Sequence, residues 1–216
     1  MDEEIAKEFM KSLKKQGLDF KLSHKVTSTK AGKDGVDVTM ESADNKAVKE
    51  KYDVVLMSIG RKPNTEGLNL EAIGIKLNEK KSIEINSKFK TSVEGIYAIG
   101  DVVPGPMLAH KAEEEGVACV ELISGQKPHI NYEMIPAIVY TNPEVASVGK
   151  TEAELKKEKI DYKIGKFPFM ANGRALTTSS PEGFVKILAD SKTDAILGAH
   201  IIGHDAGQLI AEIVTT

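Results

Sequence analysis

The chain has 216 residues, a single cysteine and no tryptophan, and its 29 basic and 32 acidic side chains give a net charge of −3. A hydrophobic share of 41% is enough for a folded core, which excludes a fully disordered chain. One cysteine excludes an internal disulfide, a multi-thiolate zinc site and a CxxC redox pair. No basic block and no apolar run of about 20 residues is present, so we expect no metal site, no nucleic-acid partner and no membrane association.

The N-terminal part predicts a helix followed by a hairpin or meander. Apolar residues recur with helical spacing over residues 5–13, and Gly17 is a suitable residue to end the helix. Apolar residues then alternate over 20–26 and again over 36–40, with a polar, glycine-containing turn at 30–35 between them. This alternation predicts two antiparallel strands.

The next part predicts buried strands and one acidic turn. The continuous apolar run at 52–59 predicts a strand buried on both faces, which stops before Pro63. Short strands are expected at 83–85 and 96–99. The second of these ends at Gly100-Asp101, followed by a proline- and glycine-containing turn.

A helix is expected over residues 108–124, ending at Gly125. Its predicted core stripe consists of Leu108, Ala112, Gly116, Cys119 or Val120, and Ile123. Cys119 is interpreted as a small buried hydrophobic residue. Lys111 and Glu115 form an i,i+4 pair that we expect to contribute only tenths of a kcal/mol.

Beyond a boundary near 126–132 the pattern changes to short strands and helices. Strands are predicted at 137–140, 145–148, 162–169, 184–188 and 196–202. Thr151 and Glu154 form a capping box for a short helix. Asp205 precedes a final apolar helix, and no C-cap signal follows it before Thr216.

An acidic residue at the carboxyl end of a buried strand lies where nucleotides bind in open sheets. The Asp101 carboxylate could accept hydrogen bonds from ribose or ribityl hydroxyls, and the free N–H groups of the following helix start would face the same crevice. The alternative is a strand-ending turn with Asp101 as a simple cap. The local sequence alone favours neither interpretation.

Longer motifs favour the nucleotide site. Residues 91–103 (TSVEGIYAIGDVV) resemble the second FAD-contact motif of the flavoprotein reductases with two dinucleotide-binding domains, and residues 58–65 (SIGRKPNT) resemble their GRxPN motif. Residues 105–116 (GPMLAHKAEEEG) resemble the dihydrolipoyl dehydrogenases within that pyridine nucleotide-disulfide oxidoreductase class. The resemblance continues through residues 135–146, 148–152, 165–169, 172–175 and 196–203.

The resemblance implies a mixed α/β and α+β fold in three regions. Residues 1–62 would be the end of a Rossmann-like NAD domain, and 63–130 a central FAD-contacting domain. Residues 131–216 would be a dimerisation domain with an antiparallel sheet, truncated at its C-terminus. The chain would therefore be an internal slice of its parent, with Met1 an ordinary interior methionine.

The resemblance also implies site residues. Gly60 matches the residue that contacts NAD, and Asp101 matches the residue that binds FAD. Residues Met107, Leu108, Ala109 and His110 match those that line the flavin. For His110 we favour contact through the backbone over imidazole catalysis.

The parts that perform the family's chemistry are absent from the sequence. It contains neither GxGxxG fingerprint, no redox-active cysteine pair and no C-terminal His–Glu acid/base pair. We therefore assign no catalytic residue. His24, His129, His200 and His204 do not match the acid/base position and are interpreted as structural or surface residues.

The parent is expected to reoxidise protein-bound dihydrolipoamide with FAD and NAD, as a homodimer through 131–216 that serves the lipoyl-bearing subunits of 2-oxoacid dehydrogenase complexes. We expect the chain alone to be inactive and to retain little FAD. Its location would be the bacterial cytoplasm or the mitochondrial matrix. Two alternatives stay open: a non-catalytic dimerisation or binding module from a truncated reading frame, and a related NAD(P)H-dependent disulfide reductase.

Overall fold

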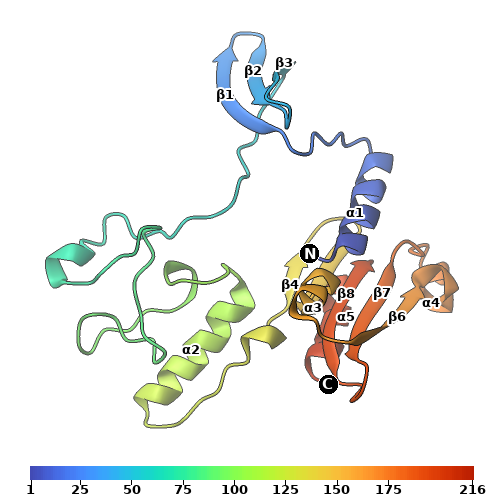
Figure 1. Ribbon diagram of the computed structural model, residues 1–216. Coiled ribbons are helices and arrows are strands. Elements are labelled where there is room, and N and C mark those ends of the chain that lie inside the picture. Colours follow the sequence, from blue (N-terminus) through green and yellow to red (C-terminus); the bar gives the residue numbers. More distant parts are fainter. The chain divides into compact units, whose positions relative to one another are not determined.

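The computed structural model describes residues 1–216, which divide into two units. The larger unit comprises residues 1–12 and 62–216, and the smaller unit comprises residues 13–61. Helix α1 (Glu3–Lys15) begins in the larger unit and ends in the smaller one (Figure 1). This division does not test the three regions expected from the sequence, whose boundaries after residues 62 and 130 stay a prediction.

The smaller unit contains an antiparallel meander of β1 (Lys25–Gly32), β2 (Gly35–Glu41) and β3 (Ala47–Tyr52), with β2 in the middle. Two antiparallel strands were expected and are present as β1 and β2, whereas β3 was not predicted. The strand expected at 20–26 begins only at Lys25, and the turn expected at 30–35 shortens to two residues. The reason is that every residue of β1 is exposed. An edge strand with no buried face needs no alternation of apolar and polar residues. The alternating apolar residues at 20–26 therefore did not mark the position of the strand.

The apolar run at 52–59 is not a buried strand, which corrects the prediction. After β3 the backbone of this segment pairs with no strand, and its side chains are exposed, Leu56 by 85% and Ile59 by 89%. A strand buried on both faces needs hydrogen-bonded neighbours and covering layers. The smaller unit supplies only a three-stranded meander, which leaves this segment without either.

The segment before α2 (Ala109–Ile123) is irregular, with a 3-10 turn, η1 (Leu70–Ile73), and a small core around Ile75, Ile83, Ala98 and Val103. The strands expected at 83–85 and 96–99 are each reduced to one isolated bridge. Tight turns follow Leu77 and precede Lys90, the partners of these two bridges. In these turns the side chains of Asn78 and Asn86 accept hydrogen bonds from backbone N–H groups. Such Asx turns compete with a longer ladder.

Helix α2 lies within one residue of the predicted bounds, but only part of the predicted core stripe is buried. Val120 and Ile123 are 62% and 58% exposed, whereas Lys111 and Glu115 are buried together with Cys119. Cys119 is a free thiol whose pKa is raised by burial, as a small buried hydrophobic residue requires. The stripe prediction was confirmed for Cys119, but it was wrong for Ile123 and for the alternative Val120, and it missed the two charged residues because it placed only apolar side chains in the interior.

The C-terminal part is a five-stranded antiparallel sheet in the order β4-β5-β8-β7-β6, which confirms the expected mixed α/β fold with an antiparallel C-terminal sheet. The strands are β4 (Ala137–Val139), β5 (Glu144–Gly149), β6 (Tyr162–Pro168), β7 (Phe184–Asp190) and β8 (Ile196–Gly203). The helices are α3 (Glu152–Glu158), α4 (Gly173–Thr177) and α5 (Ala206–Val214). The Thr151–Glu154 capping box is present as predicted.

Helices cover both faces of this sheet (Figure 1). On one face Ala206 and Ile210 of α5 pack against Ala146 and Ile201. On the other face Ile5 of α1 packs against Val145, Phe184 and Ile202. The alternation of β5 and β8 between the two sets follows from the period of two in a strand. No helix is long and apolar enough to cross a membrane.

A buried lysine joins the start of α1 to the sheet. Lys186 of β7 is fully buried, and its Nζ lies 3.0 Å from Asp2 Oδ1, 3.2 Å from Glu4 Oε2 and 2.6 Å from Glu152 Oε2. Tyr162 also donates to Glu152, at 2.6 Å. Burial by itself would lower the pKa of Lys186, but its hydrogen bonds to Glu152, Asp2 and Glu4 raise the pKa above the ordinary value. The lysine is therefore charged at neutral pH.

This cluster predicts a loss of stability in acid. Hydrogen bonds from Lys186, and then from Tyr162 and Lys156, lower the pKa of Glu152 from 4.5 to about 2. A depressed carboxyl pKa gives stability that is fully present above pH about 4.5 and lost as the pH falls toward 2, here about 3 kcal/mol. Urea unfolding of the unaltered chain at pH 6 and pH 3 should show about 2 kcal/mol of this loss, because the folded-state pKa lies below pH 3. Glu152→Gln should lose less over the same range, and equal losses in the two proteins would contradict the assignment.

Candidate cofactor site

The residue before Asp101 adopts a conformation that favours glycine. Gly100 has φ +72° and opens a 3-10 turn, η2 (Gly100–Val102), and a Cβ there would lie 3.2 Å from Cβ of Ala112 in α2. A side chain at this position would therefore be strained and would push against α2. The turn exposes the side chain of Asp101, whereas Gly100 itself is buried. The carboxylate is therefore free to face a ligand.

The start of α2 lies beside this turn. Leu108 is the N-cap residue and supplies no side-chain cap to the helix. The first N–H groups of the helix, including those of Ala109 and His110, therefore have no intrahelical acceptor. They present the positive end of the helix dipole. Met107 and Leu108 are half-buried and Ala109 and His110 are exposed, so this segment offers apolar contact together with free donors.

The Lys111–Glu115 pair is buried and bound to the turn, which corrects the prediction of a weak solvated pair. The two side chains are 2% and 3% exposed, and Lys111 Nζ lies 3.1 Å from Glu115 Oε2. Lys111 also donates to the carbonyl oxygen of Gly100 at 3.1 Å, and Glu115 accepts from the N–H of Gly100 at 2.7 Å. Spacing alone could not show this, because an i,i+4 pair has the same spacing in water and in the interior.

A tyrosine completes the polar group. Tyr132, in the 3-10 turn η3 (Tyr132–Met134), donates from its hydroxyl to Glu115 Oε1 at 3.1 Å. Burial, followed by the charge of Glu115 and this hydrogen bond, raises the pKa of Tyr132 to about 12. The hydroxyl therefore stays protonated at neutral pH and remains a donor to Glu115.

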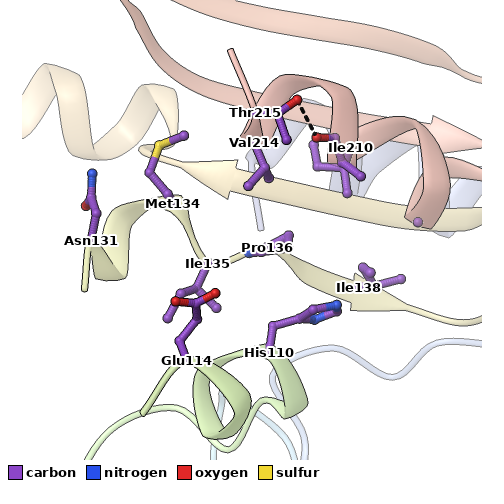
Figure 2. Close-up of a pocket in the computed structure, with 12 residues that line it drawn as sticks. His110, Glu114, Asn131, Met134, Ile135, Pro136, Ile138, Ile210, Val214 and Thr215 are labelled. Carbon is purple, nitrogen blue, oxygen red and sulfur yellow. Dashed lines mark hydrogen bonds between the residues drawn. The ribbon is translucent and has the colours of Figure 1, made fainter. Parts of the chain in front are cut away.

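A pocket of about 370 Å³ lies between α2, β4 and α5. Figure 2 shows His110 and Glu114 of α2 on one side, with Ile138 of β4 beside the imidazole and Val214 of α5 across the pocket. The His110 side chain thus lies in a mostly apolar pocket, whereas its backbone belongs to the helix start. The backbone contact expected for His110 stays a prediction.

The other predicted residues lie elsewhere. Gly60 belongs to the smaller unit, where it is exposed with φ +119°, a conformation that favours glycine. His200 is buried in β8 with Nε2 3.1 Å from the carbonyl oxygen of Lys150, which is a structural role. His204 is exposed beside Asp205, and His24 contacts the carbonyl oxygen of Leu22. The larger unit thus brings together Asp101 and residues 107–110 but none of these histidines.

The grouped residues fit a flavin nucleotide. An exposed carboxylate can accept hydrogen bonds from sugar-alcohol hydroxyls. Free N–H groups at a helix start can hold a ring carbonyl that gains negative charge. The half-buried Met107 and Leu108 side chains offer apolar surface to a planar ring. One turn and one helix start thus provide a hydrogen-bond acceptor, hydrogen-bond donors and apolar surface.

Comparisons with known proteins match the chain to one protein family. A family model described as pyridine nucleotide-disulphide oxidoreductase matches residues 1–116, and the dimerisation domain of the same family matches residues 135–216. Mitochondrial dihydrolipoyl dehydrogenase 1 of Arabidopsis thaliana is 55% identical over 99% of this chain and 42% of its own length. Dihydrolipoyl dehydrogenase of Cupriavidus necator is 54% identical over 99% of this chain and 45% of its own length.

Among solved structures, the HOCl-induced flavoprotein disulfide reductase RclA of Escherichia coli matches with a TM-score of 0.89 and 25% identity, over 99% of this chain and 48% of that one. The chain thus spans less than half the length of the relatives it matches. The matched family models cover both the candidate cofactor turn and the antiparallel sheet. The chain belongs to the pyridine nucleotide-disulphide oxidoreductase family.

Proposed function

We propose that this chain is the cofactor-contacting and dimerisation part of a dihydrolipoyl dehydrogenase, which oxidises protein-bound dihydrolipoamide to lipoamide with FAD and NAD+. The observation that carries the proposal is the Gly100-Asp101 turn held against the start of α2. It stands in a sequence 54–55% identical to dihydrolipoyl dehydrogenases. In the overall reaction the dithiol loses two electrons and two protons, NAD+ gains a hydride, and one proton is released.

Each residue has a binding role in this proposal. Bound FAD would supply a two-electron carrier between the dithiol and the nicotinamide. The Asp101 carboxylate accepts hydrogen bonds from FAD hydroxyls, and the N–H groups of Ala109 and His110 stabilise negative charge on the flavin ring. Met107 and Leu108 exclude water from the ring. Gly60 permits close approach of the nicotinamide nucleotide because it has no Cβ.

The proposal assigns no catalytic residue to this chain, so the test needs the missing parts. We would replace the matched region of the Cupriavidus necator relative, 213 residues long, with this chain and purify the full-length chimera. We expect the chimera to be yellow and to produce NADH from dihydrolipoamide and NAD+. We expect the 216-residue chain alone to give no NADH. A soluble, folded chimera without flavin, or with flavin but without turnover on dihydrolipoamide, would contradict the proposal.

The partners and location follow from the same proposal. A family model for a dimerisation domain over residues 135–216 supports a homodimer through 131–216. The lipoyl-bearing subunits of 2-oxoacid dehydrogenase complexes would be the partners that present the dithiol. The relatives include mitochondrial and bacterial proteins, which supports the mitochondrial matrix or the bacterial cytoplasm as the location. Light scattering of the chimera should give the mass of two chains, and a monomer would contradict the homodimer.

A further inference from the structure

The Lys111–Glu115 ion pair is buried, whereas i,i+4 ion pairs on helices are usually exposed to solvent. At i,i+4 on a solvated helix such a pair adds only tenths of a kcal/mol. Here both side chains are almost fully buried, at 2% and 3% exposure. Removing two charges from water is unfavourable unless each receives several hydrogen bonds of good geometry. The groups that the pair binds therefore indicate its structural role.

Those groups are the two peptide units on either side of Gly100. Glu115 Oε2 accepts from the Gly100 N–H at 2.7 Å, which fixes the peptide unit before Gly100. Lys111 Nζ donates to the Gly100 carbonyl oxygen at 3.1 Å, which fixes the peptide unit after it. That second peptide unit leads directly into Asp101. Charge-assisted hydrogen bonds are about twice as strong as neutral ones, so the backbone entering Asp101 is firmly held.

The same lysine also lies against the loop that leads to the start of α2. Gly105 has φ +121°, and a Cβ there would come within 2.8 Å of Lys111 Cε. The loop therefore passes close over the lysine side chain. The other oxygen of Glu115, Oε1, accepts from Tyr132 at 3.1 Å. The pair thus connects three segments: the turn at Gly100, the loop at Gly105 and the 3-10 turn at Tyr132.

We propose that Lys111 and Glu115 are positioning residues for FAD, which set the place of the Asp101 carboxylate relative to the free N–H groups at the start of α2. Neither side chain touches the cofactor in this assignment. The inference rests on the proposed function, because it assumes that Asp101 and the helix start bind FAD. It predicts that replacing both residues by uncharged side chains keeps the fold but weakens the binding of FAD.

The test uses the full-length chimera and three variants. Lys111→Met removes the donor to the Gly100 carbonyl and leaves the buried Glu115 carboxylate without its counter-charge. Lys111→Met/Glu115→Gln removes that unpaired charge while an amide oxygen can still accept from the Gly100 N–H. Lys7→Met is the matched control, because Lys7 and Glu3 form an i,i+4 pair that is exposed by 70% and 79%.

Three quantities would be measured: the thermal unfolding midpoint of the apoprotein, the Kd for FAD, and the visible spectrum of bound flavin. We expect Lys111→Met to lower the midpoint and the double variant to recover most of it. We expect the Kd for FAD to remain about tenfold or more above that of the unaltered chimera in both, with a shifted flavin spectrum. Lys7→Met should change none of the three.

The outcomes separate the two proposals. If the double variant recovers FAD affinity and spectrum together with stability, the pair is only structural and the inference is wrong. If both variants bind FAD like the unaltered chimera, the inference is wrong while the proposed function stands. If the folded, unaltered chimera itself binds no FAD, the proposed function fails and the inference falls with it.

Discussion

Replacing Lys186 with methionine is expected to lower the free energy of unfolding of the chain by about 3–5 kcal/mol at pH 7. The substitution keeps an unbranched side chain of similar length but removes the cation that Asp2, Glu4 and Glu152 share. Asp2 is only 1% exposed, so its carboxylate would remain buried without a counter-charge. Urea unfolding followed by far-UV circular dichroism would measure the change.

Lys163 offers the matched control for this experiment. It lies on β6 next to β7 and pairs with Asp194 at 2.9 Å, but the two side chains are 56% and 76% exposed. A surface pair of this kind contributes little to stability. We expect the unfolding midpoint of Lys163→Met to stay close to that of the unaltered chain. A similar midpoint for Lys186→Met would show that the buried cluster does not join α1 to the sheet.

Gly183→Ala is expected to be destabilising by about 3 kcal/mol or more, for a steric reason. Gly183 precedes β7 with φ +94°, and a Cβ there would lie 1.8 Å from the carbonyl oxygen of Ile202. That oxygen belongs to the backbone of β8, which is paired on both sides and cannot move aside without breaking the sheet. Thermal unfolding of the 216-residue chain would measure the loss.

Gly165→Ala is the control, because Gly165 lies in the edge strand β6, where a Cβ would have no atom within 4 Å and where φ is not positive. A glycine in such a strand gains from a side chain, so the alanine variant should be at least as stable as the unaltered chain. If Gly183→Ala and Gly165→Ala unfold at the same temperature, the tight approach of Gly183 to β8 is absent in solution.

The regular elements were predictable where a pattern reports on local packing. The helix at α1, the capping box at Thr151 and the alternation of β5 and β8 depend on neighbours within the same element or the same sheet. The run at 52–59 failed because its apolar residues need neighbouring strands, and a sequence pattern does not show whether those strands are present. The position of β1 was predicted wrongly because every residue of this strand is exposed, so its sequence shows no alternation of apolar and polar residues.

The sequence proposes the residues of the candidate site, but it does not predict the buried contacts that hold the turn at Gly100. Motif resemblance named Asp101 and residues 107–110, and the structure places the turn against the start of α2. The burial of Lys111 and Glu115 was missed, because the same letters at the same spacing are usual on a solvated helix. One signal was available: both residues lie on the same helix face as Cys119, whose burial was expected.

An FAD titration of the chimera carrying Asp101→Ala tests most directly whether the turn at Asp101 binds FAD. Asp101 is an exposed residue of the turn η2, so the loss of its side chain should leave the fold intact. Glu84→Ala, another exposed carboxylate in the larger unit, is the control. We expect the Kd for FAD to rise about 10- to 100-fold for Asp101→Ala, because charge-assisted hydrogen bonds are lost, and to stay unchanged for Glu84→Ala. An unchanged Kd for Asp101→Ala would contradict FAD binding at this turn.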